Sequence, residues 1–199
     1  MVQPFDYMHK SGNSGLVLQN YAMRPDNGGA NPASVPNRML AQPFFTGDLP
    51  RALAQIGLNC TGIGLANVKI AIYDCLSTRD IYPRNRLHDL GSVNLAATGQ
   101  RLLPAAITLA AGKLFWLVTN TDGGTGQYTT LASGNESSAP VGVVGVFISG
   151  TTTSASQLSM GLSVARSFVA EPGFPATFPV GATPVQGGGS QAAIILDPA

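Results

Sequence analysis

The residues best suited to chemistry are few and scattered along the chain. There are two histidines, His9 and His88, and residues 161–165 (Gly-Leu-Ser-Val-Ala) faintly resemble the nucleophile elbow of hydrolases. That mechanism needs an Asp and then a His after the serine, and no histidine follows His88. His88 and Asp89 are neighbours in sequence, and adjacent side chains of an extended chain point apart. The sequence therefore predicts a protein that is not an enzyme.

Metal and cofactor sites are also weakly supported. The loop from Asn120 through Asp122 and the following glycines offers oxygen ligands for calcium, but it lacks the bidentate Glu of an EF-hand, so a turn is favoured. Lys113 follows a glycine without the remaining residues of a P-loop. Cys60 and Cys75 have no histidines nearby, and buried reduced thiols are favoured over a disulfide or a zinc site. We expect no metal and no cofactor.

Aromatic side chains offer surfaces for binding. Trp116 could stack on a sugar, but it lies between Phe115 and Leu117 in an apolar run, which favours a core position. Tyr73, Tyr82 and Tyr128 lie in or near polar loops and are better placed for surface contacts. The predicted contacts to a glycan or a partner are Tyr82, Arg84, Asn120, Asp122 and Tyr128.

The elements that would position these residues are strands. Ile56, Leu58 and Cys60 alternate with more polar residues, as do residues 68–73, so these two segments are expected to pair antiparallel with one buried face. Residues 114–118 are apolar throughout, which indicates a central strand reached through a hairpin turn at 110–113. Further strands are expected at 38–45 (where Pro43 implies an edge or a bulge), 90–95, 102–109 (interrupted at Pro104), 127–132, 141–148, 158–169 (strand or short helix) and 192–196. Loops are expected at 74–89 and 120–126, and residues 171–179 form an irregular segment rich in proline and phenylalanine.

Composition agrees with an all-β protein. Charged residues are 11% of the 199 residues, against about 25% in typical proteins. The 24 glycines and 14 prolines suit short strands joined by tight turns. The net charge of +1, without a basic patch, argues against nucleic-acid binding, and no apolar run is long enough for membrane insertion. The expected fold is an antiparallel β-sandwich or jelly roll, made in a cytoplasm because no secretory signal is visible.

Residues 1–37 differ from the rest, because they are polar and interrupted by glycine and proline. Two interpretations remain open: a disordered tail, or an extended N-terminal arm that becomes ordered against another subunit. The sandwich domain is then expected at 38–199. The arm's predicted anchors are Tyr7, Leu16, Leu18 and Tyr21, together with Met8 and Met23.

Short motifs in the central stretch resemble a β-sandwich domain of tailed-bacteriophage virion proteins, which include fibre, receptor-binding and head-decoration components. The resemblance covers about residues 38–180. It rests on Ile70-Ala-Ile-Tyr73, Tyr82-Pro83, Leu90-Gly-Ser-Val93, residues 109–118 and residues 174–179.

The resemblance implies a non-enzymatic virion subunit, assembled in the host cytoplasm. Such a subunit would be a homotrimer, attached to a capsid or tail protein through its N-terminal arm. Whether it lies on the head or the tail is left open. The alternative is a carbohydrate-binding adhesin module that recognises a host surface polysaccharide.

Overall fold

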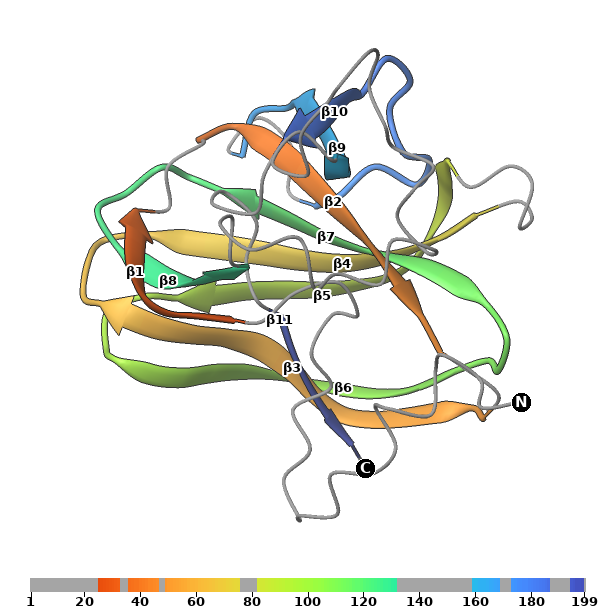
Figure 1. Ribbon diagram of the computed structural model, residues 1–199, viewed down its shortest axis with the longest axis horizontal. Helices are drawn as coiled ribbons and strands as arrows, with labels where there is room; N and C mark the ends of the chain where they lie inside the picture. Colours follow the sequence, from red (N-terminus) through yellow and green to blue (C-terminus); the bar gives the residue numbers. More distant parts are fainter. Residues whose placement is uncertain are drawn as a thin grey trace.

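The chain forms two packed antiparallel β-sheets (Figure 1), so the predicted all-β sandwich is confirmed. The computed structural model describes residues 25–32, 36–46, 49–75, 82–131, 159–168, 173–186 and 194–198. The five-stranded sheet contains β1 (Pro25–Pro32), β8 (Gln127–Leu131), β3 (Arg51–Gly62), β11 (Ile194–Pro198) and β6 (Gly99–Leu109). The six-stranded sheet has the order β10 (Thr183–Gln186), β9 (Ser159–Ala165), β2 (Arg38–Phe45), β7 (Leu114–Thr121), β4 (Asn67–Cys75) and β5 (Pro83–Asn94).

The inner core lies between the two sheets and follows from strand alternation. Ile56, Leu58 and Cys60 of β3 are buried on one face, as the sequence predicts, and they pack against Ile70 and its neighbours on β4. Because successive side chains of a strand point to opposite faces, each sheet contributes one alternating set. The remaining members come from strands of both sheets, including Phe44, Val93, Leu109, Phe115, Leu117, Tyr128, Ile194 and Leu196.

Successive strands often cross between the sheets, and this corrects two predictions. β3 and β4 do not pair: β3 pairs with β6, β8 and β11, and β4 pairs with β5 and β7. The turn after β6 is likewise not a hairpin, because β7 pairs with β2 and β4 in the other sheet. Alternation requires a buried face but does not say whether that face meets a neighbour in the same sheet or one across the core.

Other strand predictions are confirmed or extended. β7 is central, and Trp116 is fully buried there. The segment around 158–169 contains a strand, β9, and not a helix. The loop predicted at 74–89 is wrong from Pro83 onward, because those residues begin β5. β10 was not predicted, and the strand expected at 141–148 lies outside the described residues.

Two prolines lie where strand pairing is incomplete. Pro43 was expected at an edge or bulge, and it sits in the half of β2 that pairs only with β7, because pairing with β9 ends at Ala41. Pro104 interrupts β6 as expected. The register against β3 shifts there, and Ala106 has φ +46°. These features leave an irregular outer edge on β6.

Part of the N-terminal region pairs with the sandwich. β1 lies within residues 1–37 and pairs antiparallel with β8 in the five-stranded sheet. The division into an arm at 1–37 and a sandwich at 38–199 stays a prediction. The predicted anchors Tyr7, Leu16, Leu18 and Tyr21 lie outside the described residues, as do Met8 and Met23.

The six-stranded sheet also has a core on its outer face. Residues 173–182, here called the strap, lie over this face, and Phe174 and Phe178 of the strap are buried against it. The sheet contributes the fully buried Tyr73 and Trp116, with smaller side chains around them. The sheet is therefore apolar on both faces, which explains why residues 114–118 show no polar alternation.

Candidate functional site: the strap and its clamp

The strap is joined by backbone hydrogen bonds to the outer edge of β5, the side that does not pair with β4. Arg86 N donates to the carbonyl of Ala176 at 2.8 Å, and Phe178 N donates to the carbonyl of Arg84 at 2.7 Å. Asn85 and Thr177 form an antiparallel bridge between them. The strap thus adds a short pairing to the sheet edge at 84–86.

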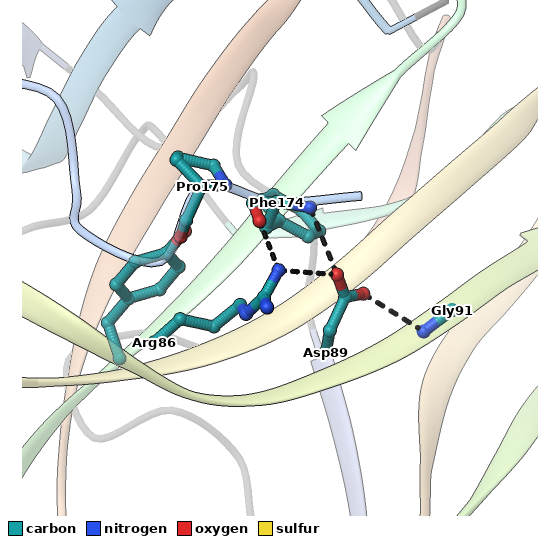
Figure 2. Close-up of polar contacts among 6 residues, drawn as sticks. Arg86, Asp89, Gly91, Phe174 and Pro175 are labelled. Atoms are coloured by element: carbon teal, nitrogen blue, oxygen red, sulfur yellow. Dashed lines mark hydrogen bonds and ion pairs between the residues drawn. The ribbon is translucent and has the colours of Figure 1, made fainter. Parts of the chain in front are cut away.

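Arg86 and Asp89 form a polar clamp beside this pairing (Figure 2). Arg86 Nη1 lies 3.0 Å from Asp89 Oδ2 and also donates to the carbonyl of Phe174. The same Asp89 oxygen accepts from Phe174 N at 3.0 Å. Both backbone groups of Phe174 are therefore held by one ion pair. Because each charged group also binds a peptide group, the contact is directional as well as electrostatic.

Two tyrosine hydroxyls fasten the rest of the strap. Tyr73 Oη donates to the carbonyl of Pro175 at 2.6 Å, and Tyr82 Oη donates to the carbonyl of Pro179 at 2.7 Å. Tyr82 Oη also accepts from Ala182 N at 3.2 Å. The Phe178 ring packs edge-on against both tyrosine rings, with centroid distances of 5.4 and 5.8 Å. Each tyrosine thus supplies an apolar contact and a polar anchor.

Burial keeps the Tyr73 hydroxyl in its neutral form. Removal from water raises the pKa of Tyr73 well above its usual range, and the positive charges of Arg86 and Arg166 offset only part of that rise. The phenol therefore keeps its proton and remains a hydrogen-bond donor to Pro175. This chemistry suits a structural fastening, because a base or nucleophile at neutral pH would need a lowered pKa.

Two of the five predicted surface contacts lie beside the strap. Arg84 is exposed on β5, and Tyr82 is partly buried with its hydroxyl already bonded to the strap. They are two residues apart in the sequence, around the start of β5, and so lie close together. The other three predicted contacts belong to different parts of the fold.

The predictions for Tyr73, Tyr128 and Asn120 are corrected by burial. Tyr73 is fully buried in the outer core. Tyr128 is 2% exposed and belongs to the inner core, and Asn120 is 4% exposed on β7. A side chain this buried cannot present a surface to a glycan. Asn120 Nδ2 instead donates to the carbonyl of Arg166 at 3.4 Å, while its Oδ1 has no hydrogen-bond partner within the described structure. Position near a polar loop misled the prediction, because β7 extends through Thr121 into the predicted loop and Tyr128 already lies within β8.

Asp122 holds two chain segments together. Its Oδ1 accepts from Asn67 N at 3.0 Å, and its Oδ2 accepts from Asn67 Nδ2 at 2.7 Å. Oδ1 also accepts from Gly124 N at 3.3 Å, which closes the turn after β7. These bonds occupy both carboxylate oxygens and agree with the expectation of a turn at this loop.

Several residues of the clamp were not singled out by sequence reasoning. Arg86 and Asp89 were placed in a loop, and the segment containing Phe174 was described only as irregular. The available signal was the pair of phenylalanines four residues apart among prolines, since a solvated loop rarely carries such side chains. No period connects them to a partner, so sequence spacing could not assign them to Tyr73 or Tyr82.

The described residues contain no group of three or more His, Cys, Asp or Glu side chains arranged to hold a metal. Cys60 and Cys75 are both free thiols, as favoured from sequence, although Cys75 is only partly buried. Within the part of the chain that the structure describes, no helix is long and apolar enough to cross a membrane. No protein-family model matches the chain, and no match is found among the curated proteins.

Proposed function

We propose that the chain is a non-enzymatic structural subunit of a bacteriophage virion, a homotrimeric fibre or decoration protein. The N-terminal residues would attach it to a capsid or tail protein, and the sandwich would project from the particle. The support for this proposal is the two-sheet fold, the weak charge of the chain and the sequence resemblance described above.

The observation that carries the structural role is the use made of polar side chains. Asp89, Arg86, Tyr73 and Tyr82 all bind the strap, and Asp122 binds Asn67 and Gly124. Groups that could have bound a ligand therefore fasten distant chain segments. A protein exposed on a particle needs such fastening, because local opening exposes it to proteases.

The test of the attachment role is deletion of residues 1–24, which leaves β1 and its pairing with β8 in place. Particles carrying the wild-type or truncated chain would be compared by immunogold electron microscopy with an antibody against the sandwich. We expect label on wild-type particles and loss of label after truncation, with an unchanged circular dichroism spectrum for the purified truncated protein.

The two parts of the proposal fail in different ways. Wild-type particles without label would overturn the virion role. Equal labelling of both particles would overturn attachment through the N-terminal residues while leaving the virion role in place. A mass other than three chains for the purified protein would overturn the trimer.

The alternative, an adhesin that binds a bacterial surface polysaccharide, is supported at the strap edge by Arg84 and the ring of Tyr82. Asn120 and Tyr128 are buried, and Asp122 already accepts hydrogen bonds from Asn67 and Gly124, so these three residues give the alternative less support. A glycan array probed with wild-type protein and with Arg84→Ala would test this alternative. Binding that the substitution abolishes would favour the adhesin, and absence of binding by folded protein would overturn it.

A further inference from the structure

Three loops meet at one end of the sandwich, at the left of Figure 1. We call residues 61–66, 95–98 and 122–126 the glycine-rich end; they connect β3 to β4, β5 to β6 and β7 to β8. Gly64 N donates to the carbonyl of Leu95 at 3.1 Å, and Leu95 N donates to the carbonyl of Ala66 at 2.9 Å. Backbone bonds thus join the first two loops.

The third loop fits against the first so closely that glycine is required. A Cβ on Gly124 would lie 1.8 Å from the carbonyl oxygen of Leu65, and a Cβ on Gly64 would lie 2.2 Å from Gly126 N. A Cβ on Gly126 would meet Leu95 Cβ at 2.7 Å. Such contacts are shorter than van der Waals distances allow. The loops therefore form a tightly packed base with little freedom to rearrange.

This base presents two large apolar side chains to solvent. Ile63 is 67% exposed and Leu65 is 86% exposed, and they lie two residues apart on the same loop. Turn positions usually carry glycine or small polar residues, so two branched aliphatic side chains are costly in water at this place. A partner that covers them would recover that free energy without first ordering the loop.

The charge of the glycine-rich end restricts the partner. Among its residues only Asp122 is ionisable, and both oxygens of that carboxylate accept hydrogen bonds within the fold. A partner selected by charge has nothing here to recognise. A second copy of the same surface does fit. Copies related by a rotation axis bring identical residues together, where like charges would repel, and the only charge on this surface is already hydrogen-bonded within the fold.

Two of the described sheet edges, those of β5 and β6, are poor alternatives for contacts between copies. β5 pairs with β4 through three register shifts, and part of its outer edge is occupied by the strap. β6 contains Pro104, which cannot donate a backbone hydrogen bond, and Ala106 with a left-handed backbone. These two edges resist addition of another strand, which favours contacts made there by side chains.

We propose that copies of this chain associate through the glycine-rich end, with Ile63 and Leu65 of each copy packed against the same residues of another. The inference rests on one part of the proposed function, the homo-oligomer, and it identifies the surface through which the copies associate. Attachment to a particle is a separate question. Deletion of residues 1–24 tests it and leaves the residues of the glycine-rich end unchanged.

The experiment is sedimentation velocity over about 1 μM to 1 mM, a range that includes weak affinities. The wild-type chain is compared with the double substitution Ile63→Asp/Leu65→Asp. The matched control is Leu49→Asp/Val180→Asp, which adds the same two charges at exposed apolar positions outside the glycine-rich end. Circular dichroism verifies that all three proteins are folded.

We expect concentration-dependent association of the wild type and the control, and association at least about 100-fold weaker for the Ile63/Leu65 variant, because like charges would face each other. Raising the salt concentration should not weaken wild-type association, since no charge pair holds it.

A wild-type chain that stays monomeric throughout would overturn the inference together with the expected trimer. Undiminished association of the Ile63/Leu65 variant would overturn the surface but keep the oligomer. Cosedimentation of a monomeric wild type with phosphatidylcholine vesicles, lost in that variant, would assign the end to a lipid surface and overturn the inference.

Discussion

The two cores of the molecule share the six-stranded sheet but are closed in different ways. The inner core is closed by a second sheet, whose alternating side chains include Leu58 and Ile56. The outer core is closed by the strap, an irregular segment with only a short backbone pairing to β5. Its buried rings are therefore held in place by the Arg86–Asp89 clamp and by tyrosine hydroxyls.

The difference shows what a segment without regular structure needs in order to cover a sheet. A strand satisfies its backbone through its neighbours, so apolar side chains suffice to hold it in place. The strap must satisfy peptide groups such as those of Phe174 and Pro175 individually, and side chains of the sheet supply the partners. Damage to the inner core should therefore unfold the whole domain, whereas damage to the clamp should first release the strap.

The largest effect is expected from Leu58→Ala in the inner core. The side chain is fully buried, and removing its methyl groups leaves a cavity between the sheets, which should lower the free energy of unfolding by about 2–5 kcal/mol. Urea unfolding followed by Trp116 fluorescence measures the loss. Leu49→Ala, at a position 58% exposed and outside the glycine-rich end, is the control and should change stability by less than about 0.5 kcal/mol. Equal losses from the two would contradict the assignment of the core.

Alkaline unfolding should report on the inner core through Tyr128. Burial raises the pKa of Tyr128 to about 12, while an unfolded tyrosine ionises near about 10. The folded state therefore holds the proton of the Tyr128 hydroxyl more tightly than the unfolded state does. The stability that the protonated hydroxyl contributes is fully present below pH about 10 and is lost as pH rises through about 12.

The measurement is urea unfolding at a series of pH values for wild type and Tyr128→Phe. The variant should lose less stability than the wild type above pH about 10. Parallel pH curves for the two proteins would show that Tyr128 does not contribute to the alkaline loss.

Asp89→Asn should weaken the clamp by about 1–3 kcal/mol, because the ion pair with Arg86 is lost and Phe174 N faces a weaker acceptor. Limited proteolysis should cut the strap faster, with a smaller change in global urea unfolding. Asp197→Asn on β11 removes the same charge outside the clamp and should leave cleavage unchanged. If cleavage and global unfolding change in proportion, the strap and the sandwich open as one unit.

The smallest effect is expected from Tyr73→Phe, which keeps the ring against Phe178 but removes the hydrogen bond to Pro175. The expected loss is about 0.5–1.5 kcal/mol. Proteolysis of the strap again gives the readout, and combination with Asp89→Asn in a double-mutant cycle measures their coupling. Strictly additive losses would argue that the two anchors hold the strap independently.

Much of the inner core could be predicted from sequence. The alternation of Ile56, Leu58 and Cys60 identified one buried face, and Pro43 and Pro104 marked incomplete pairing. The pairing partners could not be predicted, because the same alternation suits a hairpin and two strands facing each other across a core. That ambiguity explains the wrong pairing of β3 with β4.

The outer core could be predicted only in part. An all-apolar β7 indicated two buried faces, but nothing in the spacing indicated what covers the second. Arg86 of the clamp contacts a residue 88 positions later, and Tyr73 contacts one 102 positions later. Such contacts have no local period, so they emerge only when the chain is folded.

The strap and β11 come late in the chain, and each completes a different core. Phe174 and Phe178 close the outer core, and Ile194 and Leu196 enter the inner one. During synthesis, both faces of the six-stranded sheet therefore stay incompletely covered until the strap and β11 have been made. Trp116 and its neighbours remain available to other nascent chains over that interval. We expect the emerging chain to depend on chaperones until residue 196 has left the ribosome, and then to complete both cores within a short stretch of translation.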